Sequence, residues 1–432
     1  MSPKRVRRTW PQRLTLTFVI IVAIACFGAA GVLASGQWVL SQRKLVTIDT
    51  PTGAAGEAGP PEVVVPGGPP TTAGQPGGGG AAGGSDDGGT DDDLNIGDAE
   101  PDAANFLITG SDNGACKGDD AATIGDRSAL GERSDTIMVW RANPSTDQLA
   151  VLSFPRDLFV EIPGVGKRRI NQAYKRDDPT RLIETIWNNF GIPIDHYIQI
   201  DFCAFKTLVN AVGGVAVPFE YPARDVKSGL EIPEAGCVTL DGDTALAYVR
   251  SRSYRYLTPN GWREDGTSDF GRISRQQDFL RRMLARVVAE GYYDPSVARA
   301  LIETNREYLV TDLGLTVRRM LEFGGALSRF DPSEITTYRI ESYSQRLGGA
   351  DYQIPVLDNN NMQAILAVFR GEALLADAPD QAPADETSGD ETGDDTGDDT
   401  ASDDGSPSTT LPTVVAEENT EGVAPDPAAS CR

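Results

Sequence analysis

Residues 245–277 read ALAYVRSRSYRYLTPNGWREDGTSDFGRISRQQ and join an apolar run to a strongly patterned helix. Arg272, Arg275 and Gln276 stand at spacings i, i+3 and i+4, which place three polar side chains on one helical face. A separate apolar stripe would dock this helix on a core; its members are Ile273, Leu280, Leu284 and Val287. The stretch therefore predicts a packed helix with basic side chains in its first turns.

Basic side chains gather around this helix, because Arg250 and Arg252 alternate just upstream of it. Like charges brought together need a counter-charge. Planar guanidinium groups suit phosphate oxygens, and a helix N-terminus adds its own amides and dipole. The cluster therefore predicts an anion site, with a solvated basic face as the alternative that this stretch alone does not exclude.

The body of the chain alternates strand-like and helix-like segments. Strands are predicted at 105–109, 136–142, 149–154, 196–201 and 334–340. Helices are predicted at 181–190, 202–211, 241–249, 273–290, 296–305, 316–328 and 360–369. Strands interleaved with helices indicate one α/β domain around a mostly buried sheet.

The formal charge of −24 over 432 residues hides a strong asymmetry. Acidic groups concentrate in two segments of low apolar content, at 36–102 and 373–432, whereas the body at 103–372 is nearly balanced. Gly, Pro, Ala and Asp dominate the first segment, which predicts a flexible linker. Repeated Gly-Asp-Asp-Thr in the second predicts a disordered acidic tail.

Residues 14–35, LTLTFVIIVAIACFGAAGVLAS, contain no charge and are long enough to cross a bilayer. Basic residues crowd the preceding 1–13, so we expect a cytoplasmic N-terminus and an extracytoplasmic body. A cleaved signal peptide is the alternative, because small residues cluster near Ala29–Ser35. The length of the span and the lack of a sharp cleavage site favour a single-pass anchor in the cytoplasmic membrane.

An extracytoplasmic body permits disulfides. Cys26 falls in the predicted span, and four cysteines lie outside it: Cys116, Cys203, Cys237 and Cys431. Their spacing fits no zinc motif. We expect Cys203 to pair with Cys237, with Cys116 as another available partner.

Two acidic residues stand at strand ends. Asp112 follows NFLITGS and Asp135 precedes TIMVW, so both can reach the same edge of the sheet, where α/β proteins bind ligands. Two carboxylates plus a phosphate suit Mg²⁺, which keeps much of its hydration. The alternative is that Asp112 makes a turn and Asp135 caps a backbone group.

The segment SFPRD, residues 153–157, brings more charge to the same edge. Pro155 ends a strand, so Arg156 and Asp157 project beyond it, and basic residues at 167–169 follow. An exposed local ion pair between Arg156 and Asp157 is the alternative. The single histidine, His196, has no nucleophile motif beside it, and we expect it to be structural.

Many motifs in order resemble the LytR-CpsA-Psr family of membrane-anchored cell-wall proteins, actinobacterial type. They are GSD (110–112), RSDT (133–136), LSFPRD (152–157), IPG (162–164), RINQAY (169–174), LVNAVGGVAV (208–217), LDGDTALAYVRSR (240–252) and DFGRISRQQ (269–277). The resemblance covers roughly 103–290 and is looser to 370. It implies a single mixed-sheet domain with helices on both faces. Arg169 stands where many members have Lys, and about ten residues near 254–267 resemble an insertion.

The resemblance also implies an activity: a phosphotransferase that moves glycan-phosphate from a polyprenyl-pyrophosphate-linked wall polymer to a peptidoglycan sugar hydroxyl. By similarity, Asp112 and Asp135 would hold Mg²⁺. The residues that would grip the pyrophosphate are Arg156, Arg169, Arg250, Arg252, Arg272, Arg275 and Gln276. Arg156, Asp157 and Asp269 are the expected catalytic residues, and Asp157 is the candidate base for the acceptor hydroxyl.

Phosphoryl transfer mainly needs charge neutralisation and positioning, which arginines and Mg²⁺ supply without a histidine. The lipid chain needs an apolar channel, which a stripe on the helix at 202–211 could line, although core packing explains that stripe equally well. Three other functions remain open: a pyrophosphatase using water as the acceptor, a non-catalytic anchor that retains wall polymer, and a membrane-bound transcription regulator. No nucleic-acid-binding motif supports the regulator, so we expect no nucleic-acid partner.

Overall fold

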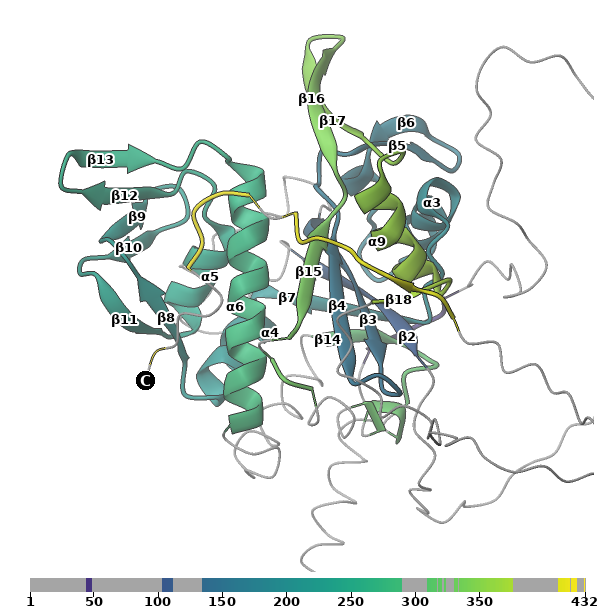
Figure 1. Ribbon diagram of the computed structural model, residues 1–432, viewed down its shortest axis with the longest axis horizontal. Coiled ribbons are helices and arrows are strands. Elements are labelled where there is room, and N and C mark those ends of the chain that lie inside the picture. The colour runs from purple at the N-terminus through teal and green to yellow at the C-terminus, as the bar shows by residue number, and fades with distance from the viewer. Residues whose placement is uncertain are drawn as a thin grey trace, which may run out of the picture.

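A seven-stranded sheet forms the centre of the molecule, and a smaller β-rich lobe lies beside it (Figure 1). The computed structural model describes residues 44–48, 103–111, 134–289, 309–316, 318–320, 322–323, 330–332, 334–375, 411–419, 421–425 and 431. Helix α6 (Asp269–Ala289) stands between the sheet and the lobe and packs on both.

The central sheet is mixed. Its order is β1 (Lys44–Val46), β14 (Leu309–Asp312), β7 (His196–Asp201), β2 (Ala104–Ser111), β3 (Ser134–Asn143), β4 (Gln148–Ser153) and β15 (Thr336–Arg339). The pairs β1–β14, β7–β2 and β4–β15 are parallel, and the other three are antiparallel. Leu107 and Val139 face one core while Phe106 and Met138 face the other, as the alternation of a strand requires.

Helices cover both faces of this sheet, as expected. Helices α3 (Thr180–Phe190) and α9 (Asn360–Arg370) pack on one face, and α6 packs on the other. Local sequence sets their ends: the Asn359 side chain accepts from the Met362 N–H and caps α9. Gly191 ends α3 at a φ of 69°, a left-handed conformation that glycine adopts at low cost.

The smaller lobe has its own apolar core. It contains α4 (Phe202–Ala211), β8 (Val215–Phe219), β9 (Ala223–Asp225), β10 (Leu230–Ile232), β11 (Gly236–Leu240), α5 (Gly242–Arg250), β12 (Arg255–Thr258) and β13 (Gly261–Glu264). A Cβ on Gly242 would lie 2.6 Å from the Lys206 carbonyl oxygen, so glycine lets α4 and α5 approach closely. The segment that resembles an insertion forms the β12–β13 hairpin, paired to β9.

Two further hairpins rise above the sheet on the other side of α6. Strands β5 (Phe159–Ile162) and β6 (Gly166–Arg169) form one and lead into a 3-10 turn at Ile170–Gln172. Strands β16 (Ser342–Leu347) and β17 (Ala350–Pro355) form the other, which projects furthest (Figure 1).

The N-terminal expectations are tested only in part. Residues 44–48 of the predicted linker are described, and β1 there pairs in parallel with β14, so this part of 36–102 belongs to the sheet. The predicted span at 14–35 lies outside the described residues. No helix in the described part of the chain is long and apolar enough to cross a membrane.

The prediction that 373–432 is a disordered tail is wrong for its described parts. We call residues 411–419 and 421–425 the C-terminal segment; it runs from α9 across α6 towards the smaller lobe (yellow in Figure 1). Strand β19 (Thr413–Val414) pairs with β18 (Leu374–Leu375). The Thr337 N–H donates to Glu418 Oε1 at 2.6 Å, and the Arg339 N–H to Asn419 Oδ1 at 2.9 Å. The segment thus covers the outer side of β15, an edge strand. The backbone groups of β15 that face away from β4 would otherwise lack partners.

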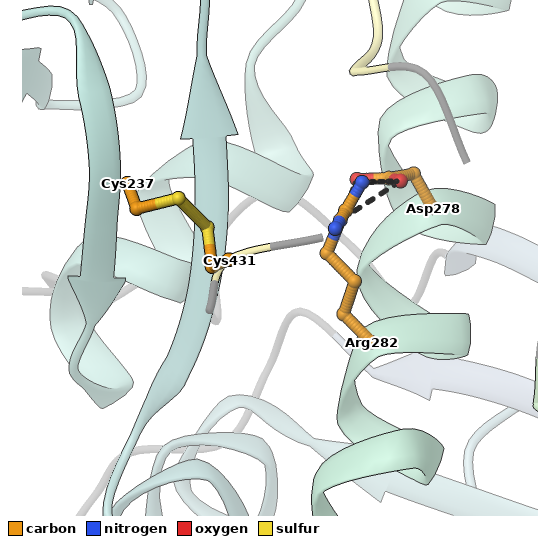
Figure 2. The surroundings of a disulfide bond; sticks show 4 residues. All are labelled: Cys237, Asp278, Arg282 and Cys431. Atoms are coloured by element: carbon orange, nitrogen blue, oxygen red, sulfur yellow. Dashed lines mark hydrogen bonds and ion pairs between the residues drawn. A yellow bond between two sulfur atoms is a disulfide. The ribbon is translucent and has the colours of Figure 1, made fainter. Parts of the chain in front are cut away.

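The predicted disulfide between Cys203 and Cys237 is also wrong. Cys237 on β11 bonds instead to Cys431, with Cα atoms 5.6 Å apart (Figure 2). Cys203 is disulfide-bonded as well, and its pairing lies outside the described residues. Because the tail was expected to be disordered, Cys431 was not considered as a partner of Cys237. The prediction therefore paired Cys237 with Cys203, the other cysteine of the body.

Candidate active site

The end of β2 and the start of β3 meet at one edge of the sheet. Ser111 pairs with Ser134 across this antiparallel ladder, which brings Asp135 to that edge as predicted. A Cβ on Gly110 would lie 3.1 Å from Thr136 Cβ, so a larger residue there would crowd the strand beside Asp135. Asp112 lies outside the described residues, and its role as a metal ligand stays a prediction.

Asp135 is held by two arginines that are distant in sequence. Its Oδ1 lies 2.8 Å from Arg156 Nη1, and its Oδ2 lies 3.5 Å from Arg272 Nη1. Arg272 Nη2 also donates to the Asp135 carbonyl oxygen at 2.7 Å. Burial opposes the charge of this carboxylate, but Arg272 and Arg156 outweigh it and hold the pKa of Asp135 below its ordinary value. Asp135 is therefore ionised at neutral pH.

Asp157 bridges two of the predicted arginines. Its Oδ2 lies 3.3 Å from Arg156 Nε, and its Oδ1 lies 3.0 Å from Arg169 Nε. Arg169 is fixed further by the β16–β17 hairpin, because it donates to the Asp351 carbonyl oxygen and lies over the Tyr352 ring. Both carboxylate oxygens of Asp157 therefore serve to orient guanidinium groups.

Asp269, the first residue of α6, lies among three guanidinium groups. Its Oδ1 is 3.0 Å from Arg272 Nη2, 3.2 Å from Arg252 Nε and 3.9 Å from Arg156 Nε. Burial lowers the pKa of Arg252, and although Asp269 opposes this, repulsion from Arg156 and Arg272 adds to the lowering. The cluster is therefore only partly neutralised by its own carboxylates.

Residues of the first turns of α6 point to different places. Arg272 and Gln276 line a pocket, and Gln276 Nε2 donates to Thr136 Oγ1 and to the Val249 carbonyl oxygen, both at 3.0 Å. Arg275 is fully buried away from this pocket, with its Nη1 at 2.7 Å from Asp265 Oδ2. The structure therefore does not bring Arg275 to the predicted pyrophosphate site.

A carboxylate that sequence reasoning missed shapes the turn after α5. Asp225 Oδ2 accepts from Ser251 Oγ at 2.7 Å and from the backbone N–H groups of Arg252 at 3.0 Å and Ser253 at 2.8 Å. This buried side chain fixes the direction of Arg252. Arg250, at the end of α5, lies over the Phe202 ring at 4.5 Å. Asp225 lies in no recognisable motif. Its position beside Arg252 depends on the backbone path of β9, which the sequence does not show.

The pocket itself has a volume of about 320 Å³. We call it the arginine pocket; it is lined by Gly110, Asp135, Thr136, Phe202, Asp225, Lys227, Ser228, Arg250, Arg252, Ser253, Ser268, Arg272 and Gln276. Arg156, Asp157, Arg169 and Asp269 are not among the lining residues. Arg156 and Asp269 hold residues that are, and Asp157 links Arg156 to Arg169. The buried Nε atoms of Arg156 and Arg252 face carboxylates, whereas that of Arg272 makes no hydrogen bond within the described residues. Donors of this kind suit an anion with several oxygens.

Other candidates fall outside the pocket. His196 is buried, with its Nδ1 3.4 Å from Asp312 Oδ1, in keeping with a structural role. Val209 and Val212 of the apolar stripe on and after α4 pack in the core of the smaller lobe, and only Phe202 of that stripe lines the arginine pocket.

Asp135 fits a role as one ligand of Mg²⁺. It is ionised, it lines the arginine pocket, and this ion binds through few carboxylates plus phosphate oxygens. No cluster of three or more acidic, histidine or cysteine side chains that could hold a metal occurs in the described residues.

Comparison with known proteins identifies the family. The model of the LytR_cpsA_psr family matches residues 85–367, well over half of the chain. This chain belongs to the LytR-CpsA-Psr family. The matched range contains the whole arginine pocket and ends before the C-terminal segment, so that segment is a feature of this chain beyond the family match.

Named relatives are about one-third identical to this chain over the residues that align. The probable cell wall biosynthesis protein LcpB of Corynebacterium glutamicum is 34% identical over 189 residues, which cover 43% of this chain and 42% of LcpB. TagU of Oceanobacillus iheyensis, named a polyisoprenyl-teichoic acid–peptidoglycan teichoic acid transferase, is 30% identical over 261 residues, or 59% of this chain and 72% of TagU. The chain thus spans less than half of LcpB.

Solved structures include Bacillus subtilis TagV and an enzyme from Actinomyces oris. TagV is 26% identical with a TM-score of 0.46, and the match covers 62% of this chain and 98% of TagV. The Actinomyces oris enzyme is 23% identical with a TM-score of 0.49, and the match covers 62% of this chain and 89% of that enzyme.

Proposed function

We propose that this LytR-CpsA-Psr protein transfers glycan-phosphate from a polyprenyl-pyrophosphate-linked wall polymer to a sugar hydroxyl of peptidoglycan. One observation carries the proposal: Arg250, Arg252 and Arg272 line a single pocket together with Gln276 and an ionised Asp135. The name of TagU, a polyisoprenyl-teichoic acid–peptidoglycan teichoic acid transferase, supports this reaction class.

The arginines would bind the two phosphates of the donor. Burial and repulsion from Arg156 and Arg272 lower the pKa of Arg252, and phosphate oxygens would relieve that repulsion. Bidentate contacts from planar guanidinium groups hold phosphates in a fixed orientation, which phosphoryl transfer requires. As the acceptor oxygen bonds to the phosphorus of the transferred glycan-phosphate, the bond to the leaving phosphate breaks, and polyprenyl phosphate departs with the extra negative charge. The same guanidiniums neutralise that charge.

Asp157 was the candidate general base from the sequence, and its contacts support a different role. Both of its oxygens are engaged by Arg156 and Arg169, so it orients guanidinium groups at the rim of the arginine pocket. Asp269 holds Arg252 and Arg272 in the same way. We therefore assign Asp157 and Asp269 as positioning residues, and the acceptor proton leaves through solvent or phosphate oxygen.

Mg²⁺ belongs to the proposal as the partner of Asp135 and, from the sequence, of Asp112. Bound there with the donor phosphates, the ion would neutralise charge on the phosphate oxygens. A membrane anchor at 14–35 would keep the site outside the cytoplasm and near a lipid-linked donor.

The test compares transfer with hydrolysis on a defined lipid-linked glycan. We expect purified protein to attach glycan-phosphate to peptidoglycan and to release polyprenyl phosphate only when acceptor is present, both followed by mass spectrometry. Arg252→Ala should lower kcat/KM by roughly a hundredfold, because one charged donor to the transition state is lost. Arg346→Ala, which removes an exposed arginine of the β16–β17 hairpin, is the matched control and should keep full activity.

Equal release with and without acceptor would identify a pyrophosphatase. Donor binding without any turnover would identify a polymer-retaining anchor. Unchanged kinetics in Arg252→Ala would remove the arginine pocket from the reaction.

A further inference from the structure

A second concave surface lies beside the arginine pocket. This groove of about 770 Å³ is bounded by the end of β8, the β12–β13 hairpin and the C-terminal segment. Tyr221, Tyr256 and Tyr254 follow one another along it, with ring centroids 5.9 Å and 6.4 Å apart and ring planes tilted by 36° and 30°. We call it the tyrosine groove. Tyr221 and Tyr256 are partly exposed and form its aromatic face, and the buried Tyr254 closes its inner end.

Polar groups accompany the rings in the groove. Arg263 stands opposite Tyr256 in the β12–β13 register, and Glu220 precedes Tyr221; both charged residues line the groove. Backbone and side-chain atoms of Val423, Ala424 and Pro425 form the facing wall. The groove thus combines flat apolar surfaces with a few charged hydrogen-bonding groups, the composition of a site for an amphipathic ligand.

The inner end of the tyrosine row is rigid. Tyr254 is only 5% exposed, and its ring lies 4.6 Å from the Arg275 guanidinium carbon. Arg275 in turn donates to the Ser251 carbonyl oxygen at 2.8 Å and to the Val423 carbonyl oxygen at 2.9 Å. One buried arginine therefore supports the aromatic face from behind and fastens the facing wall. Such preorganisation reduces the entropy lost when a ligand binds.

The groove and the arginine pocket are continuous along the chain. Ser253 lines the pocket, and the next residue, Tyr254, lines the groove. Asp225 holds the Ser253 N–H, so the step between the two surfaces is fixed. The two surfaces therefore follow one another in sequence, although no residue lines both.

We propose that the tyrosine groove is a saccharide subsite that binds one or more sugar rings of the glycan substrate. A sugar ring has an apolar face of C–H groups that stacks on tyrosine, and hydroxyls that suit Glu220 and Arg263. A polyprenyl chain would bury these two charged groups without giving them partners, which is unfavourable. The identity of the glycan rests on the proposed function, whereas saccharide binding itself does not.

The test measures binding of chitotetraose, a soluble oligomer of N-acetylglucosamine, by titration calorimetry on the whole protein. Wild type should bind, and Tyr256→Ala and Tyr221→Ala should each weaken binding by roughly tenfold, the loss of one stacking contact. Tyr256→Trp should retain binding because it keeps an aromatic face. Tyr343→Ala on the β16–β17 hairpin removes a tyrosine that is 52% exposed and far along the chain, and it should change nothing.

Three results would overturn the subsite. They are the absence of chitotetraose binding to wild type, chitotetraose binding as tight as that of wild type in both alanine variants, and a loss of polyprenyl phosphate binding in Tyr256→Ala. Melting curves confirm that each variant folds. If Tyr256→Ala does not fold, Tyr221→Ala provides the same test.

Transfer kinetics then distinguish the source of the sugar. A raised KM for the peptidoglycan acceptor alone in Tyr256→Ala assigns the groove to the acceptor, and a raised KM for the lipid-linked donor alone assigns it to the donor polymer. The protein could bind saccharide in a manner that depends on Tyr256 and yet show no transfer activity. That result would support the saccharide subsite and contradict the proposed function.

Discussion

Arg272 and Arg275 lie three residues apart on α6 and are both almost fully buried, yet they belong to different regions of the molecule. Arg272 faces the arginine pocket and shares its two carboxylates, Asp135 and Asp269, with other arginines. Arg275 faces a support region behind the pocket, where it has one carboxylate, Asp265, and the C-terminal segment. Arg272 shares its carboxylates with other arginines, so positive charge remains available for a ligand. Arg275 pairs with a carboxylate of its own, and that pair serves the fold.

The largest expected effect separates these two arginines by stability. Arg275→Met leaves Asp265 buried without its ion-pair partner and should cost about 3–5 kcal/mol of unfolding free energy. Arg272→Met should cost clearly less, because Arg156 still pairs with Asp135 and Arg252 with Asp269. Urea unfolding of both variants gives the comparison. Equal losses would show that the two arginines do not differ in role.

Removal of the disulfide tests the support region alone. The double variant Cys237→Ser/Cys431→Ser should lose about 2–4 kcal/mol, the usual range for a native cross-link. Serines are preferable to a reductant, which would also break the disulfide of Cys203. Pyrophosphate binding at the arginine pocket, measured by calorimetry, should be unchanged. A large loss of that binding would show that the two regions are coupled.

Acid titration of stability gives the smallest difference and contrasts two carboxylates near α6. The pKa of Asp135 is lowered, so below its ordinary value of 3.8 the unfolded chain binds more protons and stability is lost as pH falls. The pKa of Asp278 is raised by burial even though Arg282 opposes the shift (Figure 2). Stability should therefore fall as pH rises from 3.8 to the folded-state value of Asp278.

Asn variants of the two residues measure these opposite slopes. Asp135→Asn should flatten the loss of stability below pH 3.8, and Asp278→Asn should remove the decline above it. Unfolding free energies measured by urea titration at a series of pH values provide the readout. Slopes of the same sign for both residues would contradict the assignment.

Regular local patterns made much of the central domain predictable. The runs at 105–109, 136–142 and 196–201 lie within strands, and the run at 149–154 extends one residue past the end of β4. The helices predicted at 181–190, 202–211 and 360–369 lie within α3, α4 and α9. The patterns that predict these strands and helices depend only on residues that are near one another in sequence. The helix predicted at 296–305 and part of that at 316–328 lie outside the described residues.

Pairings between distant residues escaped prediction. The spacing of Arg272, Arg275 and Gln276 correctly placed them together on a helix, but a helical face is wide enough to meet two environments. Asp225 and Asp265 decide where the neighbouring arginines point, and neither lies in a motif. The C-terminal segment was misjudged because acidic repeats dominate the composition of 373–432, while its anchoring uses a few specific hydrogen bonds that Glu418 and Asn419 accept from backbone N–H groups of β15.

The cross-link between Cys237 and Cys431 imposes an order on biosynthesis. The two cysteines are separated by 194 residues, so a chain made from its N-terminus completes β11 long before its partner thiol exists. During that interval Cys203 is the nearer thiol in sequence, and pairing of consecutive cysteines is the kinetic competitor of the native bond. A Cys203–Cys237 bond formed in that interval must be opened by thiol–disulfide exchange before the native bond can form.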